Sequence, residues 1–325
     1  MSDPLLHHGG NLAAARARFG DGPWLDLSTG INPKAWPVPD ALDVDLGPLP
    51  DPAALAALEA AAAEHFGVAA EQLCAVPGSE MGLRLLGTIL GGRACHIVPG
   101  YRTHAAAFPD STPLAADSPI AGDAALLLAN PNNPLGILLD RDTLEAMLAE
   151  RTAKGGWLIV DEAFADAHPN ASIAALVHED RRLIVFRSFG KFFGLAGVRL
   201  GFVLAPRPIL ARYRAMLGDW PIDATALAIG TRAYRDARWI AATREALGVR
   251  AAAFDSLLNA HGLMAMGESP LFRLVAHAEA PTLFERLARA NILVRPFDYA
   301  PHWLRFGMPA DPDALARIDR VLRDG

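Results

Sequence analysis

The sequence predicts an α/β protein, with a large domain on a mostly parallel sheet and a smaller α+β domain built from both chain ends. Two observations carry this prediction. In the middle of the chain, apolar runs of strand length alternate with longer helical stretches, a rhythm typical of a parallel sheet with helices on both faces. Over about the last hundred residues, long Ala/Arg-rich helices and short strands replace that rhythm.

The expected elements follow in order along the chain. Residues 1–45 hold few helix or strand signals and several turn formers, so we expect an arm that packs on the C-terminal part. In the large domain we expect strands at 73–76, 94–98, 124–129, 157–160, 183–186 and 198–204, and helices at 52–66, 81–90, 141–154 and 207–216. After these we expect helices at 224–233, 237–260, 281–290 and 312–322, and strands at 271–275 and 293–295. The predicted domains are the arm (1–45), the large domain (46–235) and the small domain (236–325).

Composition narrows the class of protein. With 52% hydrophobic and 20% charged residues, the chain has the mix of a globular protein rather than a disordered one. A net charge of −6 argues against a general nucleic-acid binder, which needs a basic surface. Two cysteines, Cys74 and Cys95, can form neither a disulfide framework nor a thiolate-rich metal site. The histidines include no His-x-x-x-His pair, so we expect no bound metal.

No targeting or membrane segment is expected. The N-terminus is polar and lacks the basic-then-apolar pattern of a signal peptide. The longest charge-free apolar stretch, 124–139, is interrupted by Asn-Pro-Asn-Asn-Pro and falls short of the roughly 20 residues that span a bilayer. We therefore expect a cytoplasmic protein that acts on a small molecule, without nucleic-acid or membrane partners.

The most informative segment surrounds Lys191, in SFGKFFGLAGVR (188–199). A lysine amid glycine and aromatic residues, directly after an apolar strand, is poorly solvated, and its amine suits Schiff-base chemistry. Ser188 and Arg199 add a hydroxyl and a guanidinium, the donor types that hold a phosphate. The alternative is a solvated lysine on a surface loop.

Asp161 is the second candidate. It follows the apolar run WLIV (157–160), at the carboxyl end of an expected strand, where open α/β sheets collect their ligands. A buried carboxylate needs a partner, and a protonated pyridine nitrogen would serve. A helix N-cap is the alternative role.

Two loops that follow expected strands complete the set. In ANPNNPLG (129–136), prolines stiffen the loop and leave asparagine amides to donate to a ligand, although a plain turn explains the pattern equally well. In VPGSEM (76–81), a strand runs through a glycine into a helix, a geometry that offers backbone N–H groups to an anion. A capped helix without a ligand is the alternative there.

The order of these four segments resembles that of the fold-type I pyridoxal-phosphate enzymes, in the class I and II aminotransferase group, over essentially the whole chain. The resemblance implies the fold-type I transferase fold, with pyridoxal 5'-phosphate bound to Lys191 as a Schiff base. It also implies that Asp161 keeps the pyridine nitrogen protonated, which makes the ring an electron sink. Further implied cofactor ligands are Asn133 at the ring's 3-oxygen, Tyr101 stacked on the ring, and Gly78, Ser79, Glu80, Ser188 and Arg199 around the phosphate.

Both chain ends resemble one branch of this family, the threonine-phosphate decarboxylases of cobalamin biosynthesis. The matching segments are HGGN (8–11), LDLSTGINP (25–33), NILVRPFDY (291–299) and WLRFG (303–307). Arginine forks suit a substrate that carries both a carboxylate and a phosphate. A salt-bridged scaffold for the arginines and a disordered terminus around His8 are the alternatives. The substrate-binding residues that the resemblance implies are His8, Gly9, Asn32, Asn133, Arg295 and Arg305.

The implied reaction is decarboxylation of L-threonine O-3-phosphate to (R)-1-amino-2-propanol O-2-phosphate, in a homodimer. Because orientation decides which bond at the substrate's Cα breaks, an aminotransferase of the histidinol-phosphate type stays open, as does a non-catalytic relative. Three positions depart from the wider family. Phe164 lacks a tyrosine hydroxyl, Leu49 replaces a tyrosine that reaches across the dimer, and Gly190 lacks a hydroxyl before the lysine. We expect these losses to loosen cofactor binding but to leave the Schiff-base chemistry intact.

Overall fold

The computed structural model describes residues 3–40 and 42–323, which divide into two compact units. The larger unit holds residues 35–133 and 138–240, and the smaller unit holds the described residues up to 34, residues 134–137 and those from 241 on. Both ends of the described chain therefore belong to the smaller unit. The domain limits expected at residues 45 and 235 stay predictions.

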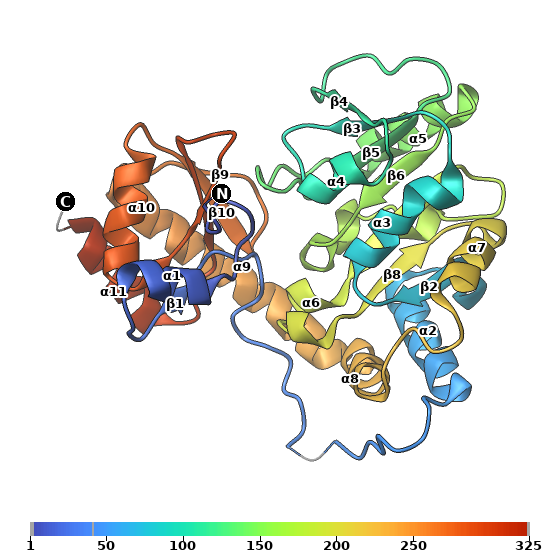
Figure 1. Ribbon diagram of the computed structural model, residues 1–325, viewed down its shortest axis with the longest axis horizontal. Helices are drawn as coiled ribbons and strands as arrows, with labels where there is room; N and C mark the ends of the chain where they lie inside the picture. Colours follow the sequence, from blue (N-terminus) through green and yellow to red (C-terminus); the bar gives the residue numbers. More distant parts are fainter. Residues whose placement is uncertain (1–2, 41, 324–325) are drawn as a thin grey trace. The chain divides into compact units, whose positions relative to one another are not determined.

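A seven-stranded sheet forms the centre of the larger unit (Figure 1). In spatial order its strands are β2 (Leu73–Val76), β8 (Gly201–Leu204), β7 (Leu183–Ser188), β6 (Leu158–Asp161), β5 (Ala125–Ala129), β3 (Ala94–Ile97) and β4 (Thr112–Leu114). Strand β8 runs antiparallel to both of its neighbours, and the pairs from β7 to β4 are parallel. The predicted α/β class with a mostly parallel sheet is confirmed.

One face of this sheet and two helices share a buried apolar cluster. Helices α3 (Ser79–Leu90) and α7 (Arg207–Leu217) pack there on every second residue of the strands. Since side chains alternate along a strand, Asp161 belongs to the same face as Ile159 of that cluster. Helix α5 (Arg141–Ala153) contacts β6, and α2 (Pro52–Phe66) packs on α8 (Ala224–Arg235).

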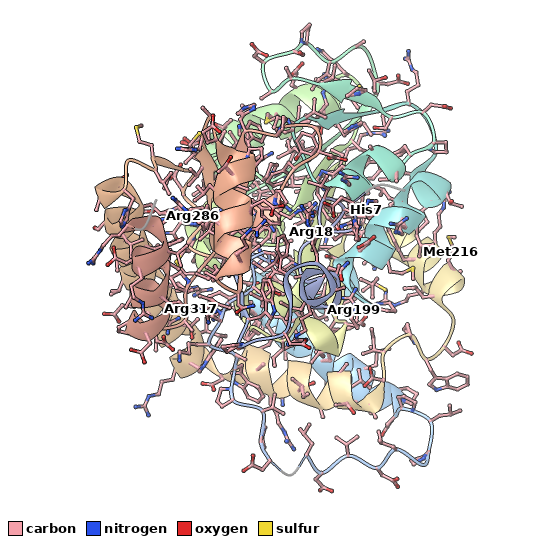
Figure 2. All side chains as sticks on the ribbon, turned by 60° about the vertical axis from the view of Figure 1, so that its left-hand side comes forward. His7, Arg18, Arg199, Met216, Arg286 and Arg317 are labelled. Carbon is pink, nitrogen blue, oxygen red and sulfur yellow. The ribbon has the colours of Figure 1, made fainter. Side chains whose placement is uncertain are left out.

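The smaller unit contains an antiparallel sheet with the order β12 (Arg295–Pro296), β13 (Trp303–Gly307), β10 (Phe272–Ala276) and β9 (Ala265–Met266). A second, two-stranded sheet pairs β1 (Leu25–Asp26) with β11 (Ile292–Leu293). Its helices are α1 (Leu12–Phe19), α10 (Ala280–Arg289) and α11 (Pro312–Arg323). Arg18 of α1, labelled in Figure 2, forms ion pairs with Asp3 and with Glu285 of α10. The N-terminal segment is thus joined to C-terminal elements by a strand pair and by ion pairs.

Helix α9 (Ala237–Ala260) is the longest helix described, and it begins in the larger unit and ends in the smaller one. It carries five charged residues among its 24: Arg238, Arg244, Glu245, Arg250 and Asp255. Across residues 3–40 and 42–323, no helix is long and apolar enough to cross a membrane.

The structure corrects the sequence prediction in several places. Residues 12–19 form helix α1, capped by Asn11, where few helical signals were expected. The strand expected at 198–204 begins only at Gly201, because Arg199 takes a left-handed backbone conformation with φ of 54°. The strand expected at 293–295 is split into β11 and β12, which pair with different partners. Helices α4 (Arg102–Ala106) and α6 (Phe189–Phe192) were not expected, since elements this short show no readable apolar period.

Candidate active site

Asp161 ends strand β6 and is held by two donors. The residue is 4% exposed, and its Oδ1 accepts a hydrogen bond from the Ala163 N–H at 3.1 Å. Its Oδ2 lies 3.0 Å from Nε2 of His104, which is fully buried on α4. No α-helix starts at Asp161, in contrast to the N-cap alternative. A buried carboxylate needs donors to replace its lost hydration, and His104 supplies one that the sequence did not indicate.

Lys191 sits on the short helix α6, directly after β7. The flanking residues Phe189, Phe192 and Phe193 are fully buried. The Phe193 ring stacks on Phe189 and on Trp239, with ring centroids 4.7 and 5.5 Å apart. These rings fix the backbone from which the half-buried lysine extends. The residue therefore stands on an anchored helix rather than on a surface loop.

The turn between β2 and α3 meets the guanidinium of Arg199, which is labelled in Figure 2. Gly78 has φ of +83°, and a Cβ at this position would lie 2.8 Å from Arg199 Nη2. Glycine is required both by the backbone conformation and by the room that the guanidinium takes. Helix α3 has no side-chain N-cap, so the N–H groups of Ser79 and Glu80 at its start are placed to bind an anion.

Gly201 allows β8 to approach this turn closely. A Cβ at Gly201 would lie 2.3 Å from the backbone nitrogen of Ser79 and 2.9 Å from the carbonyl oxygen of Arg187. Gly201 is also the register partner of Ser188, the last residue of β7. The predicted phosphate residues of three segments, 78–80, 188 and 199, are thus brought together around one glycine that the sequence analysis had not singled out.

Tyr101 is anchored through its hydroxyl group. Its Oη donates to Oε2 of Glu80 at 2.8 Å, and its ring meets the His104 ring edge-on at 5.8 Å. Burial raises the pKa of Tyr101 to about 12, and the hydrogen bond and charge of Glu80 act in the same direction. The phenol therefore stays protonated at neutral pH and can donate.

The asparagine loop after β5 is held by its own amides. Asn130 donates to the carbonyl of Leu139 at 3.0 Å and accepts from its N–H at 2.8 Å. Asn132 donates to the carbonyl of Pro99 at 3.1 Å. Each of these two amides gives an N–H to the protein backbone. Donation to a ligand by the asparagine amides of this loop, Asn133 included, stays a prediction.

A buried charge network ties β6 to β7. Arg187 places Nη1 2.7 Å from Oε2 of Glu162 and Nη2 2.5 Å from Oδ1 of Asp166. Nε2 of His65 lies 2.9 Å from the same oxygen of Asp166. Burial alone would raise the pKa of Asp166, but Arg187 and His65 outweigh it and lower that pKa to about 2.

The charge network lies on the opposite face of the sheet from Asp161 and Ser188, the candidate residues at the ends of β6 and β7. Glu162 follows Asp161 and Arg187 precedes Ser188, so strand alternation turns the ion pair to the opposite face. The carboxylates and the histidine do not form a metal site: in the described part of the chain, no three His, Cys, Asp or Glu side chains are grouped to hold an ion. The network instead fixes the two strand ends relative to each other.

In the smaller unit, Arg295 and Arg305 are register partners on β12 and β13, and each is 7% exposed. Arg295 donates to the carbonyl of His7 at 2.7 Å, and Arg305 donates to the carbonyl of Ser28 at 3.0 Å. Burial and the charge of Arg295 lower the pKa of Arg305 to about 10. An anion bound beside the two guanidinium groups would relieve this repulsion.

The N-terminal residues of the predicted substrate set lie in the same unit. A Cβ at Gly9 would fall 2.2 Å from the carbonyl oxygen of Ser28, so only glycine permits this approach. Asn32 is 2% exposed, and its Oδ1 accepts from the N–H of Lys34 at 3.0 Å. His8 is exposed, with its ring edge-on to His7. By unit, Lys191, Asp161 and the predicted phosphate residues belong to the larger part, and His8, Gly9, Asn32, Arg295 and Arg305 to the smaller.

Comparison with known proteins identifies the family. The model of the family described as aminotransferase class I and II matches residues 113–321, more than half of the chain. The chain belongs to the aminotransferase class I and II family. Two curated relatives of this chain are named threonine-phosphate decarboxylase. That of Sinorhizobium sp is 40% identical over 98% of this chain and 100% of the relative, and that of Pseudomonas aeruginosa is 38% identical over 98% and 97%.

Several solved structures share the fold of this chain. The L-threonine-O-3-phosphate decarboxylase from Porphyromonas gingivalis has a TM-score of 0.76 at 19% identity, covering 92% of this chain and 98% of its own. The histidinol-phosphate aminotransferase from Sinorhizobium meliloti, in complex with pyridoxal-5'-phosphate, has a TM-score of 0.77 at 18% identity, covering 99% and 97%. At these identities the likeness bears on the fold alone.

The sequence analysis did not identify three features of the site: His104, Gly201 and the Glu162–Arg187 ion pair. His104 lies 57 positions from its partner Asp161, and no local pattern connects them. Gly201 looks like an ordinary strand glycine until the neighbouring turn is seen. For the ion pair, a signal was present: a charged residue at the end of each of two apolar strands requires a buried partner.

Proposed function

We propose that the chain is a threonine-phosphate decarboxylase, which uses pyridoxal 5'-phosphate to convert L-threonine O-3-phosphate to (R)-1-amino-2-propanol O-2-phosphate and carbon dioxide. One observation carries the proposal: two relatives that bear this name are 38–40% identical over 98% of the chain. We infer that this reaction belongs to cobalamin biosynthesis, as the resemblance of the two chain ends implies.

The larger unit has groups that fit this cofactor. The glycine at 78 leaves a cradle that a Cβ would fill, lined by the start of α3 and by the Arg199 guanidinium, and it suits a phosphate. The buried carboxylate of Asp161, oriented by His104, suits a protonated ring nitrogen. The amine of Lys191 stands on a helix that four aromatic rings anchor. Donor set and charge therefore match an anionic pyridine aldehyde.

When bound, pyridoxal phosphate supplies an acceptor for the electrons of the bond that breaks at the substrate's Cα. Each candidate residue of the larger unit then has one task. Lys191 would hold the cofactor through its amine, a group suited to Schiff-base chemistry with an aldehyde. Asp161 holds the proton on the ring nitrogen, and His104 holds Asp161. Ser188, Arg199 and the 78–80 turn bind the phosphate and so fix the ring's position.

We assign recognition of the substrate to Arg295 and Arg305. Threonine phosphate carries a carboxylate and a phosphate, and each needs a planar, charged donor in a site with little water. The two guanidinium groups are buried on paired strands, and burial and the charge of Arg295 lower the pKa of Arg305, an effect that these anions would offset. His8, Gly9, Asn32 and Asn133 complete the assigned set.

Incubation of the purified protein with pyridoxal phosphate and L-threonine O-3-phosphate tests the function. We expect carbon dioxide and aminopropanol phosphate to form without any oxo-acid acceptor, and Lys191→Ala to lose at least about a thousandfold of the rate. Dependence on 2-oxoglutarate, with pyridoxamine phosphate accumulating, would instead show an aminotransferase of the histidinol-phosphate type. A protein that never takes up pyridoxal phosphate would be a non-catalytic relative.

We further infer a cytoplasmic homodimer, as the resemblance implies. In support of a second chain, Leu46 and Leu49 stand 74% and 65% exposed on a segment of the larger unit without helix or strand. We assign these two leucines to the surface that the second chain covers. Light scattering of the purified protein should give the mass of two chains, and a monomer across the working concentration range would refute the dimer.

A further inference from the structure

The side chain of Glu80 occupies an unusual place for an acid. It lies in the first turn of α3, beside the cradle of Gly78 and Arg199 that we assign to the cofactor's phosphate. An acid in the first turn of a helix interacts well with the helix dipole, but next to a phosphate it adds repulsion. The carboxylate therefore needs a task that outweighs this cost.

Hydrogen bonds commit the Glu80 carboxylate to the segment after β3. Its Oε2 accepts from the Tyr101 hydroxyl at 2.8 Å, and its Oε1 accepts from Thr103 Oγ1 at 3.3 Å. Arg84, one turn further along α3, donates to Oε1 from Nε at 2.9 Å and from Nη2 at 2.7 Å. Partial burial acts to raise the pKa of Glu80, but these bonds outweigh it and lower that pKa. The acid is thus ionised at neutral pH, and Arg84 balances its charge.

The bond from Tyr101 to Glu80 fixes a ring that is half-buried and can pivot about its Cα–Cβ and Cβ–Cγ bonds. A phenol in such a position needs a partner for its hydroxyl, and a bond to a carboxylate is shorter and stronger than one to a neutral group. The same ring meets His104 edge-on, and His104 binds Asp161. Glu80, Tyr101, His104 and Asp161 therefore form a continuous series of contacts within the larger unit.

We propose that Glu80 is a positioning residue, which holds the Tyr101 ring at a fixed angle for stacking on the cofactor and does not itself bind the phosphate through its carboxylate. The role rests on the proposed function, since it presumes that the ring of pyridoxal phosphate lies against Tyr101. Its backbone N–H remains part of the predicted phosphate turn. The side chain acts one step away, through the tyrosine.

Cofactor affinity in a double-mutant cycle tests the proposal without any substrate. We expect Glu80→Ala to weaken the binding of pyridoxal phosphate by about fivefold to tenfold, as the loss of one charge-assisted hydrogen bond predicts. In a Tyr101→Phe background the same change should cost less than about twofold, because the hydroxyl it served is gone. Glu80→Gln keeps an acceptor oxygen and should stay within about threefold of the parent protein. Glu145→Ala, which breaks the exposed Arg141–Glu145 ion pair on α5, is the control.

A second measurement reads the hydroxyl directly in the cofactor-free protein. With carbon-13 at Cζ of the tyrosines, the Tyr101 resonance is the one missing from Tyr101→Phe. It should shift in Glu80→Ala and stay in place in Glu145→Ala. An unmoved resonance, or a Glu80→Ala effect on affinity that is as large in the Tyr101→Phe background, would overturn the role. Cofactor affinity and the Tyr101 resonance do not depend on which bond the enzyme breaks. Both can therefore be interpreted even if the decarboxylation assay fails.

Discussion

His104 is the residue that most changes the picture of the site. Its Nε2 lies 3.0 Å from Oδ2 of Asp161, and both side chains are buried. Its Nδ1 is buried, with no hydrogen-bond partner in the described ranges 3–40 and 42–323. The pair thus fixes the ring orientation through one nitrogen, and the position of the Asp161 carboxylate follows from it.

Replacing His104 by phenylalanine should keep the volume and remove the bond. We expect kcat/KM to fall about 10- to 100-fold, because a buried polar group that loses its partner costs roughly 1–3 kcal/mol. Steady-state kinetics of the loaded enzyme measures this. His178→Phe, at an exposed histidine that pairs with Asp180, should leave kcat/KM unchanged. An unchanged rate in His104→Phe would mean that Ala163 alone suffices to hold the carboxylate.

Gly201 makes a second prediction at the level of one residue. In Gly201→Ala, the new Cβ would lie 2.3 Å from the backbone nitrogen of Ser79, and backbone cannot swing away as a side chain does. We expect unfolding free energy to fall by about 1–3 kcal/mol and cofactor affinity to fall with it, since the phosphate turn must shift. Urea denaturation and cofactor titration measure the two. Gly197→Ala, four residues earlier with nothing within 4 Å, should change neither.

Among the elements, β6 and β7 depend on one ion network. Arg187→Met would leave Glu162 buried without its cation and Asp166 with His65 alone, and we expect a loss of about 3–5 kcal/mol in unfolding free energy. Denaturant titration at neutral pH checks this. Arg207→Met removes a comparable bond to Glu179 that is exposed, and its cost should not exceed about 1 kcal/mol. Equal losses in the two variants would contradict the role of the network.

The same network predicts how stability depends on pH. The pKa of Asp166 is lowered from 3.8 to about 2 in the folded chain, so the unfolded chain takes up the proton first as the pH falls. The stabilisation from this acid is complete above pH 3.8 and is lost progressively as the pH drops toward about 2. Unfolding free energies measured across this window should fall less steeply in Asp166→Asn than in the parent protein. If the unfolding free energies of the two proteins fell equally steeply with pH, Asp166 would not be the source of the pH dependence.

For the whole molecule, cofactor binding should raise the melting temperature. A ligand that binds only the folded state adds about 2.7 kcal/mol at a free concentration roughly 100 times its Kd. Pyridoxal without its phosphate cannot use the cradle of Gly78 and Arg199, and we expect it to give a smaller rise at equal concentration. Differential scanning fluorimetry compares the two. Equal rises would mean that the phosphate is not held by the turn.

The course of the chain through both units was predictable in outline. Apolar runs marked β5, β6 and β7, because a buried parallel strand has to be apolar on both faces. Helix α1 and the short helices around Tyr101 and Lys191 were missed, since their burial depends on contacts with distant segments rather than on their own period. The family was recognisable because cofactor chemistry restricts residue types within short segments.

By itself, the sequence determined which groups this protein offers: a lysine and an aspartate after apolar strands, a glycine turn before a helix, and two arginines near its end. Those identities are local, and the chemistry of each follows from its type and its nearest neighbours. Only the tertiary structure decided which of these groups are in contact. Asp161 pairs with His104, Tyr101 with Glu80, and the turn at 78 with Gly201 and Arg199. Hydrogen bonds and close packing require separations of a few ångströms, and chain folding, not spacing in the sequence, sets those separations.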